Sequence, residues 1–261
     1  GIMERSEQIA AERGKERVVR FRASQIFEHS LIMVAFSVLV ITGLPQRFPD
    51  NGWSQWLIQN LGGIYTTRLI HRGFGFVLVF GAVYHIGFIL SHVFRRKRPL
   101  SMMLTFRDFR DAIATLRYDL GLIDQQPQLG RYDFRQKFEY WGMVFGSTVM
   151  ILSGLILMYP IVVTRLLPGQ LIPAAKAMHG YEGLLALLII LIWHLYGAHF
   201  GPEKFPFDSS IFTGRISRER MQREHSLEYQ EMLNAEASTA VPQETQDQGG
   251  VETREEAEGK S

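Results

Sequence analysis

The chain has 261 residues, 46% of them hydrophobic, and a formal net charge of +2 at neutral pH. It contains no cysteine, which excludes iron–sulfur clusters held by cysteine and covalent haem attachment through a C-x-x-C-H motif. The small positive charge follows the alternation of charged and apolar segments and indicates no nucleic-acid binding.

The apolar residues are gathered into four blocks, at roughly 27–45, 69–94, 139–162 and 178–200. Each block is close to the length of about 20 residues that a helix needs to cross a bilayer. The sequence therefore predicts an all-α integral membrane protein built as a four-helix bundle. Because the N-terminal region is charged and no small-residue cleavage site follows the first block, we expect the first helix to direct insertion, without a removed signal peptide.

The charged segments set the expected domain organisation. A polar stretch near the C-terminus, 216–234, suits a charged helix, and the residues after it are mostly polar, a composition typical of disorder. The expected parts are an N-terminal arm at 1–24, a transmembrane domain at 25–201, a C-terminal extension at 202–235 and a disordered tail at 236–261.

Lysine and arginine are concentrated in the N-terminal arm and in the segment after the second block, whereas the connections after the first and third blocks hold few. Basic residues flanking membrane helices favour the cytoplasmic side. We therefore expect a multi-pass protein of the bacterial cytoplasmic (inner) membrane, surrounded by lipid, with both termini in the cytoplasm.

The first block carries His29 within about one turn of its inner end, and Pro45 is predicted to end the helix. The outer connection that follows, 46–68, contains three large aromatic residues: Trp53, Trp56 and Tyr65. They suit an aromatic belt at the level of the lipid headgroups, and a docking surface for an outer partner is the alternative.

The second block has His71 at its outer end, followed by His85 and then by His92, at spacings that keep all three within a narrow arc of one helix face. Four glycines also lie in this block: Gly73, Gly75, Gly81 and Gly87. They leave room for a flat molecule against the backbone, and they equally allow two helices to approach closely.

Between the second and third blocks, apolar residues recur at helical spacing from Met102 to Leu116, with arginine and aspartate between them. This pattern predicts an amphipathic helix on the cytoplasmic membrane surface, or one that packs on a cytoplasmic domain. The third block has no histidine, and its small residues Gly142 and Gly146 suit close packing within the bundle.

The fourth block holds His179 near one end and His194 near the other. In an α-helix this spacing separates them by roughly 22 Å along the axis and leaves them within roughly 60° of one face. The histidines therefore fall at two depths. His71 and His179 lie at the outer level, and His29, His85 and His194 lie at the inner level.

Two opposed imidazoles from different helices are the ligands that a b-type haem needs, with its propionates reaching the polar surface. Arg68 and Arg72 are well placed for the propionates of an outer haem. Intramembrane histidines also suit a proton or ion path, but only Glu182 offers a buried acidic residue to continue a relay.

Several short motifs support the haem interpretation in combination. They are Arg22-Ala-Ser-Gln-Ile-Phe-Glu-His29, Thr42-Gly-Leu44, Leu69-Ile-His-Arg72, Lys137-Phe-Glu-Tyr-Trp141, Ser153-Gly-Leu155, Met178-His-Gly-Tyr-Glu182 and Trp193-His-Leu-Tyr196. Over about 20–200 the chain resembles the four-helix di-haem cytochrome b family. That family includes the gamma subunit of membrane formate dehydrogenase and the cytochromes b of nickel–iron hydrogenases and thiosulfate reductase. The stretch from Phe205 to Tyr229 is similar to family variants that have multihaem c-type cytochromes as partners.

The resemblance implies two haem b groups. The implied ligands are His71 and His179 for the outer haem, and His29 and His194 for the inner haem. His85 is an alternative inner ligand, because helices two and four alone hold both haems in the cytochrome b of the bc complexes. The Phe-Glu-His context favours His29, whereas helix periodicity does not separate the two. A third haem bound through His85 or His92 is a further alternative.

The resemblance also implies a quinone, menaquinone or ubiquinone, that exchanges electrons near the inner haem. The residues in that neighbourhood are Tyr132, Asp133, Lys137, Glu139 and His199, each of which also suits interfacial anchoring. The expected function is that of a respiratory-chain cytochrome b subunit, which passes electrons between the quinone pool and an extracytoplasmic partner. That partner is a multihaem c-type cytochrome or an iron–sulfur, molybdenum or nickel enzyme, and substrate chemistry belongs to it. The alternatives are a histidine-based proton or ion pathway and a non-redox membrane anchor.

Overall fold

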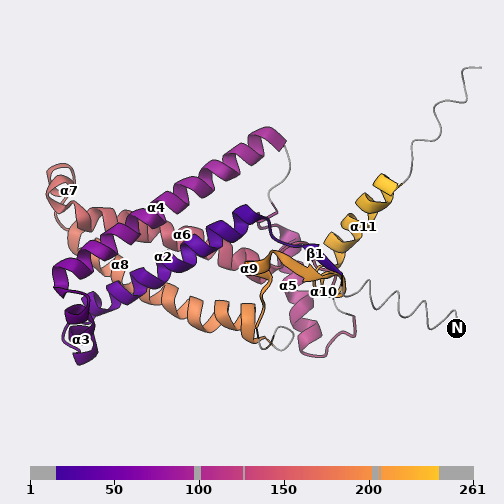
Figure 1. Ribbon diagram of the computed structural model, residues 1–261, viewed down its shortest axis with the longest axis horizontal. Coiled ribbons are helices and arrows are strands. Elements are labelled where there is room, and N and C mark those ends of the chain that lie inside the picture. Colours follow the sequence, from indigo (N-terminus) through magenta and orange to yellow (C-terminus); the bar gives the residue numbers. More distant parts are fainter. Residues whose placement is uncertain (1–15, 97–100, 126, 202–204, 206, 241–261) are drawn as a thin grey trace, which may run out of the picture.

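The computed structural model describes residues 16–96, 101–125, 127–201, 205 and 207–240. Its long helices run side by side as α2 (Ala23–Arg47), α4 (Gly63–Arg96), α6 (Phe134–Met158) and α8 (Leu171–Leu188) (Figure 1). The fourth helix continues beyond α8 through two π-helical stretches, η1 (Ile189–His194) and η2 (Tyr196–Phe200).

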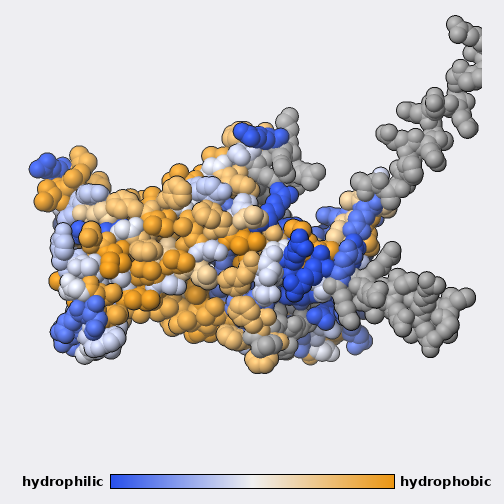
Figure 2. Space-filling model, viewed as in Figure 1, coloured by the Kyte–Doolittle hydropathy of each residue, from blue (hydrophilic) through white to orange (hydrophobic). Residues whose placement is uncertain are grey.

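Within the described residues, four helices are long and apolar enough to cross a membrane. Figure 2 shows a hydrophobic band over these helices and hydrophilic residues towards both ends. Large apolar side chains such as Phe80 and Phe145 are 59% and 70% exposed, as expected for surfaces that face lipid. The predicted all-α membrane bundle is therefore confirmed.

The two ends of the bundle differ. At one end lie α3 (Gly52–Asn60) and α7 (Pro160–Leu166), and at the other lies α5 (Phe106–Asp119), beside the two β-strands and the last helices of the described chain (Figure 1). After the predicted orientation, we call the end with α3 and α7 the outer end and the opposite end the inner end.

The prediction that Pro45 ends the first helix is wrong, because α2 continues to Arg47 with Pro45 inside it. A proline in the last turn removes only one backbone donor. That turn is stabilised by other hydrogen bonds, since Gln46 Nε2 donates to the Thr42 carbonyl at 2.9 Å and the Phe48 amide donates to the Leu44 carbonyl at 3.0 Å.

The four helices form two hairpins. α2 packs mainly along α4, and α6 mainly along α8, whereas contacts between the two hairpins are sparse. Small residues such as Ala35 and Ala175 are almost fully buried. The histidines predicted to bind a cofactor therefore come from hairpins that face each other across a loosely packed interior.

The amphipathic helix predicted after the second block is α5, which is attached to the first turns of α6. Lys137 Nζ donates to Asp108 Oδ1 at 2.7 Å and to the Met103 carbonyl at 3.2 Å, and Trp141 Nε1 donates to the Met102 carbonyl at 3.0 Å. The exposed apolar residues of α5 are Phe106, Phe109, Ile113 and Leu116. This attachment places the apolar side chains of α5 at the inner end of the spans.

The N-terminal arm and the C-terminal extension form one small unit at the inner end. Strand β1 (Arg17–Val19) pairs antiparallel with β2 (Arg215–Ser217), with Val18 opposite Ile216. The helices of this unit are α9 (Ser210–Thr213), α10 (Arg218–Glu224) and α11 (Ser226–Ala240). Its apolar core consists of Val18, Ile216 and Met221, with Tyr229 and Met232 packed against it.

This unit differs from the single charged helix expected over 216–234. The segment begins as a strand because Ile216 pairs with the N-terminal arm, and the helix is interrupted at His225 between α10 and α11. The last helix reaches Ala240, beyond the expected start of the tail at 236. Residues 1–15 of the arm and 241–261 of the tail lie outside the described residues.

A buried charge network ties this unit to the bundle. Arg20, only 3% exposed, pairs with Glu228 at 2.5 Å and donates to the Arg131 carbonyl, and Arg131 pairs with the same glutamate. The Arg20 guanidinium also lies 5.3 Å from the ring centre of Tyr132. Since a buried charge is costly without its partner, this network fixes the chain just before α6 begins.

Candidate functional site

The outer pair of histidines comes from both hairpins. His71 on α4 and His179 on α8 have ring centres 6.2 Å apart, with planes inclined at 73°. A metal–imidazole bond is about 2.0 Å long, so two imidazoles on opposite sides of one metal ion have ring centres roughly 6 Å apart. The separation of this pair therefore fits a metal ion held between the two rings.

A hydroxyl group orients each ring of the outer pair. Thr42 Oγ1 lies 2.9 Å from His71 Nδ1, and Ser153 Oγ lies 2.9 Å from His179 Nδ1. Thr42 and Ser153 are buried, with 1% and 3% of their surface exposed. Each hydroxyl donates to the backbone carbonyl one turn earlier in its own helix. The hydroxyls therefore accept the Nδ1–H groups, which leaves Nε2 of both rings available to a metal.

A glycine follows each hydroxyl residue. A Cβ atom at Gly43 would lie 3.0 Å from His71 Cε1, and one at Gly154 would lie 3.3 Å from His179 Cε1. Both motifs were noted in the sequence, but their contacts with the histidines were not predicted. The signal was available, because a hydroxyl residue followed by Gly-Leu occurs once in each hairpin.

The inner pair has the same separation. His29 on α2 and His194 on η1 have ring centres 6.2 Å apart, with planes inclined at 33°. His194 Nδ1 lies 3.0 Å from the carboxylate of Glu139 on α6, which accepts its N–H. Nε2 of His194 is therefore the nitrogen available to a metal, as in the outer pair.

The π-helical turn η1 adjusts the position of His194. The interval from His179 to His194 is one residue longer than the interval from His71 to His85. A π-helical turn accommodates one extra residue per turn, because its hydrogen bonds run from residue i to i+5. The extra residue in the fourth helix is therefore taken up without turning His194 away from the interior.

His85 does not face another histidine. Its Nδ1 lies 2.6 Å from the Glu28 carboxylate and its Nε2 lies 2.9 Å from the Tyr140 hydroxyl, so both ring nitrogens have partners within the protein. Glu182 was expected to be the only buried acidic residue able to continue a relay, but Glu28 and Glu139 also lie inside spanning helices, with side chains 15% and 24% exposed. Both lie near the starts of their helices, where polar residues in the sequence indicate the flank of a membrane span and not its interior.

Neither pair offers a complete metal site from protein alone. In the part of the chain that the structure describes, no group of three or more His, Cys, Asp or Glu residues is arranged to hold a metal ion. Each pair could therefore supply two ligands to a metal ion, and a porphyrin is a group that would supply the remaining four nitrogens. The His92 side chain, considered for a third haem, lies outside the described residues.

A model of the family described as prokaryotic cytochrome b561 matches residues 8–106 and 107–206. The chain belongs to this family. It is therefore a multi-pass cytochrome b of the bacterial inner membrane that functions in electron transfer, and family membership implies b-type haem.

Relatives with assigned roles are formate dehydrogenase subunits. The cytochrome is 22% identical over 209 residues to the cytochrome b556(Fdn) subunit of the nitrate-inducible formate dehydrogenase of Escherichia coli strain K12, covering 80% of this chain and 88% of that subunit. It is 22% identical to the cytochrome b556(fdo) subunit of the same strain, covering 70% and 80%. The Haemophilus influenzae formate dehydrogenase cytochrome b556 subunit is 23% identical, covering 68% and 71%.

The arginines predicted to bind propionates, Arg68 and Arg72, are exposed at the outer end of α4 of the cytochrome. Sequence reasoning missed Arg47, which lies against the residue that follows His179. A Cβ atom at Gly180 would be 3.0 Å from Arg47 Nε, and the guanidinium is 5.2 Å from the ring centre of Tyr181. Arg47 therefore places a positive charge beside the outer pair.

Most residues predicted for the quinone region contact other protein groups. The Tyr132 hydroxyl accepts a hydrogen bond from Gln25, and Asp133 caps α6 by accepting the Gln136 amide at 2.8 Å. Lys137 is engaged by α5, as described above, and Glu139 accepts from His194. These four residues thus build the inner end of the cytochrome.

His199 differs from the other four residues. Its Nδ1 is buried and has no hydrogen-bond partner among the described residues, and its ring stacks on Phe207 with centres 4.3 Å apart. A buried polar atom without a partner is costly. His199 Nδ1 therefore lacks, among the described residues, the hydrogen-bond partner that such an atom usually has.

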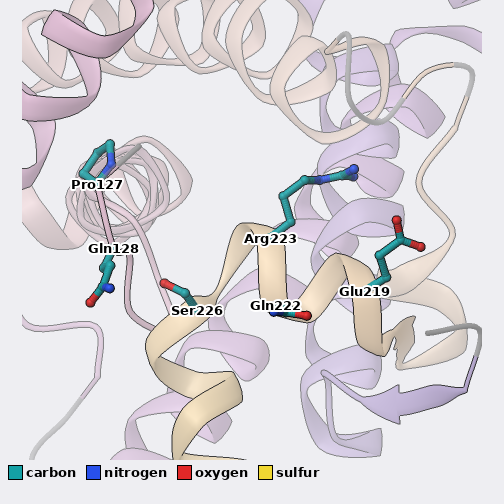
Figure 3. A pocket seen from close by; sticks show the side chains of 6 residues that line it. All are labelled: Pro127, Gln128, Glu219, Gln222, Arg223 and Ser226. Atoms are coloured by element: carbon teal, nitrogen blue, oxygen red, sulfur yellow. The ribbon is translucent and has the colours of Figure 1, made fainter. Parts of the chain in front are cut away.

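A polar pocket of about 400 Å³ lies between the middle of the α5–α6 connection and α10 (Figure 3). Its lining residues are Pro127, Gln128, Glu219, Gln222, Arg223 and Ser226. Ligand pockets are lined mainly by apolar and aromatic side chains. This pocket lacks such a lining and contains none of the histidines, so it is not part of the candidate site.

Proposed function

We propose that this cytochrome holds two b-type haems, one between His71 and His179 and the other between His29 and His194. The observation that supports this most strongly is the equal 6.2 Å separation of both ring pairs, at opposite ends of the bundle. Nδ1 of three of these four rings is bonded to a neighbouring helix, which holds the ring and directs Nε2 towards the interior.

The haems supply reversible one-electron chemistry, and the chain supplies axial ligands, a low-dielectric surrounding and fixed spacing. Helix geometry sets the two levels roughly 20 Å apart along the bundle. The two levels therefore give electrons a route across the bilayer. A histidine-based proton or ion path is the competing proposal, and it requires no haem at either level.

We infer that a quinone, menaquinone or ubiquinone, exchanges electrons at the inner end. Support comes from Nδ1 of His199, which is buried, has no hydrogen-bond partner among the described residues and follows His194 closely in the same membrane span. This nitrogen would hydrogen-bond a quinone oxygen. Reduction of a quinone by two electrons also takes up two protons, so electrons arriving from outside would separate charge. A quinone or inhibitor mapped to the outer end would contradict this location.

The partner is proposed to be an extracytoplasmic redox protein, with both termini of the cytochrome in the cytoplasm. The relatives named above belong to formate dehydrogenases, which favours an enzyme as the partner, of the iron–sulfur, molybdenum or nickel class expected from the sequence. The resemblance over Phe205 to Tyr229 favours a multihaem c-type cytochrome instead. Reporter fusions after Arg47 and after Ala240 test the orientation, because only the second should report cytoplasm.

Haem content tests the proposal directly. The purified cytochrome should contain two haem b per chain by pyridine haemochrome, and His71→Leu and His29→Leu should each contain one. His225→Gln is the matched control, since this histidine lies in the inner-end unit, and it should keep both haems. A wild-type protein without haem would favour the proton path or a plain anchor.

A further inference from the structure

His85 is an intramembrane histidine that belongs to neither pair, yet it joins three helices. Located on α4, it bonds Glu28 of α2 through Nδ1 at 2.6 Å and Tyr140 of α6 through Nε2 at 2.9 Å. Because a carboxylate only accepts, Nδ1 carries the proton, and Nε2 of the neutral imidazole then accepts from the tyrosine hydroxyl. These bonds connect the two hairpins, between which other contacts are sparse.

The surroundings of His85 repeat those of His194. In both cases a glutamate on the preceding long helix accepts from Nδ1, at 2.6 Å from Glu28 and at 3.0 Å from Glu139. Phe27-Glu28-His29 on α2 corresponds to Phe138-Glu139-Tyr140 on α6. The second hairpin therefore has tyrosine at the position where the first has the histidine of the inner pair.

The difference between His29 on α2 and Tyr140 on α6 determines which side chain each glutamate-bound histidine faces. His194 faces His29 with Nε2 available, whereas Nε2 of His85 is taken by the Tyr140 hydroxyl. An imidazole nitrogen that accepts a hydrogen bond has no lone pair left for iron. His85 is thus unsuited to be a ligand in this arrangement.

The hydrogen bonds of His85 connect it to residues next to the inner pair. His85 contacts Glu28, the chain neighbour of His29, and Tyr140, the chain neighbour of Glu139, which in turn bonds His194. The imidazole planes of the inner pair are inclined at 33°, against 73° for the outer pair.

We propose that His85 is a positioning residue of the inner haem site, which fixes the relative rotation of the His29 and His194 rings by bonding Glu28 and Tyr140. This inference rests on the proposed function, since it assumes iron between those rings. It also excludes the alternative in which α4 and the fourth helix alone hold both haems.

The test is electron paramagnetic resonance of the oxidised protein, because the angle between axial imidazole planes controls the anisotropy of a low-spin ferric haem signal. Two signals are expected in the wild type, the less anisotropic one from the inner haem. His85→Leu should shift the inner signal and leave the outer signal unchanged. Tyr140→Phe, which removes one bond and keeps the imidazole, should produce a smaller shift of the same signal.

Two variants serve as controls. Glu28→Gln is the conservative replacement: it keeps an acceptor for Nδ1 and should keep the inner signal near its wild-type position. Ile86→Leu, at an exposed neighbour of His85 on the same helix, is the neutral control and should change nothing. Haem content is measured on every variant, so the two failures are distinguishable. A wild type with fewer than two haems contradicts the proposed function, whereas two haems with an unchanged inner signal in the variants contradict only the role of His85.

The proposal is overturned if Tyr140→Phe and His85→Leu both leave the inner signal at its wild-type position. It is also overturned if His85→Leu loses one haem while His29→Leu keeps two, because His85 would then be the ligand. Should His85→Leu fail to accumulate, the shift in Tyr140→Phe alone decides the question.

Discussion

At the scale of single residues, the outer site depends on two hydroxyl groups that no apolar residue can replace. Thr42→Val and Ser153→Ala each leave a buried Nδ1–H without an acceptor and free the ring to rotate. Loss of such a partner typically weakens metal binding about 10–100-fold, so we expect the outer haem to dissociate faster in both variants. The measurement is haem loss to an excess of apomyoglobin, followed in the Soret band.

Matched controls come from the same helices. Ser37 on α2 and Thr148 on α6 also donate to the carbonyl one turn earlier, but they are on the exposed side and contact no histidine. Ser37→Ala and Thr148→Val should keep wild-type haem loss. Equal rates in all four variants would show that the hydroxyls do not support the outer rings.

His225 makes the inner-end unit sensitive to acid. Burial and, as the second cause, the positive charge of Arg20 lower the pKa of His225 from 6.5 to about 4. The unfolded state therefore binds a proton at higher pH than the folded state, so stability is full above pH 6.5 and falls as the pH drops towards 4. The loss is on the order of 3 kcal/mol at the lower limit.

Amide exchange in β1 and β2, corrected for intrinsic rates, measures this dependence. Protection should fall between pH 6.5 and 4.5 in the wild type and stay nearly constant in His225→Gln. The same fall in the variant would assign the acid sensitivity to other groups.

At the scale of elements, a buried ion pair between Asp108 and Lys137 holds α5 to the start of α6. Burial raises the pKa of Asp108, but hydrogen bonds from Lys137 and Thr105 outweigh it and lower that pKa overall, so this carboxylate is charged at neutral pH. Asp108→Asn leaves Lys137 buried without its anion, which typically costs about 3–5 kcal/mol. We expect amide protection across α5 to fall roughly 100-fold or more.

Asp111→Asn is the control for this prediction. Asp111 pairs with the well-exposed Arg107 at 3.5 Å on the same helix, and such a pair contributes about 0.3–0.5 kcal/mol. Its removal should leave protection almost unchanged. If both variants behave alike, α5 is held by its apolar contacts and not by the ion pair.

The sequence predicted the elements better than their contacts. Hydropathy located the four spans because a bilayer requires long apolar helices, and histidine depth separated the outer from the inner group. The sequence did not predict the π-helical turn that contains His194, because i→i+5 hydrogen bonds leave no pattern in the composition. It also missed Glu28 and Glu139 as histidine partners, because these contacts join helices that are far apart in the chain.

At the scale of the whole molecule, two hairpins with sparse mutual contacts bring four histidines together in two pairs. The inner-end unit joins the N-terminal arm, the α5–α6 connection and the C-terminal extension, and so closes the bundle beside the inner pair. The architecture therefore has one candidate haem position at each membrane surface and one candidate quinone contact, His199, at the inner one.

The most direct measurement of this arrangement is an anomalous difference map collected at the iron absorption edge from crystals of the purified cytochrome. Two iron peaks are predicted, one midway between His71 and His179 and one midway between His29 and His194. A map with no iron between these rings, or with a peak bound to His85, would contradict the account.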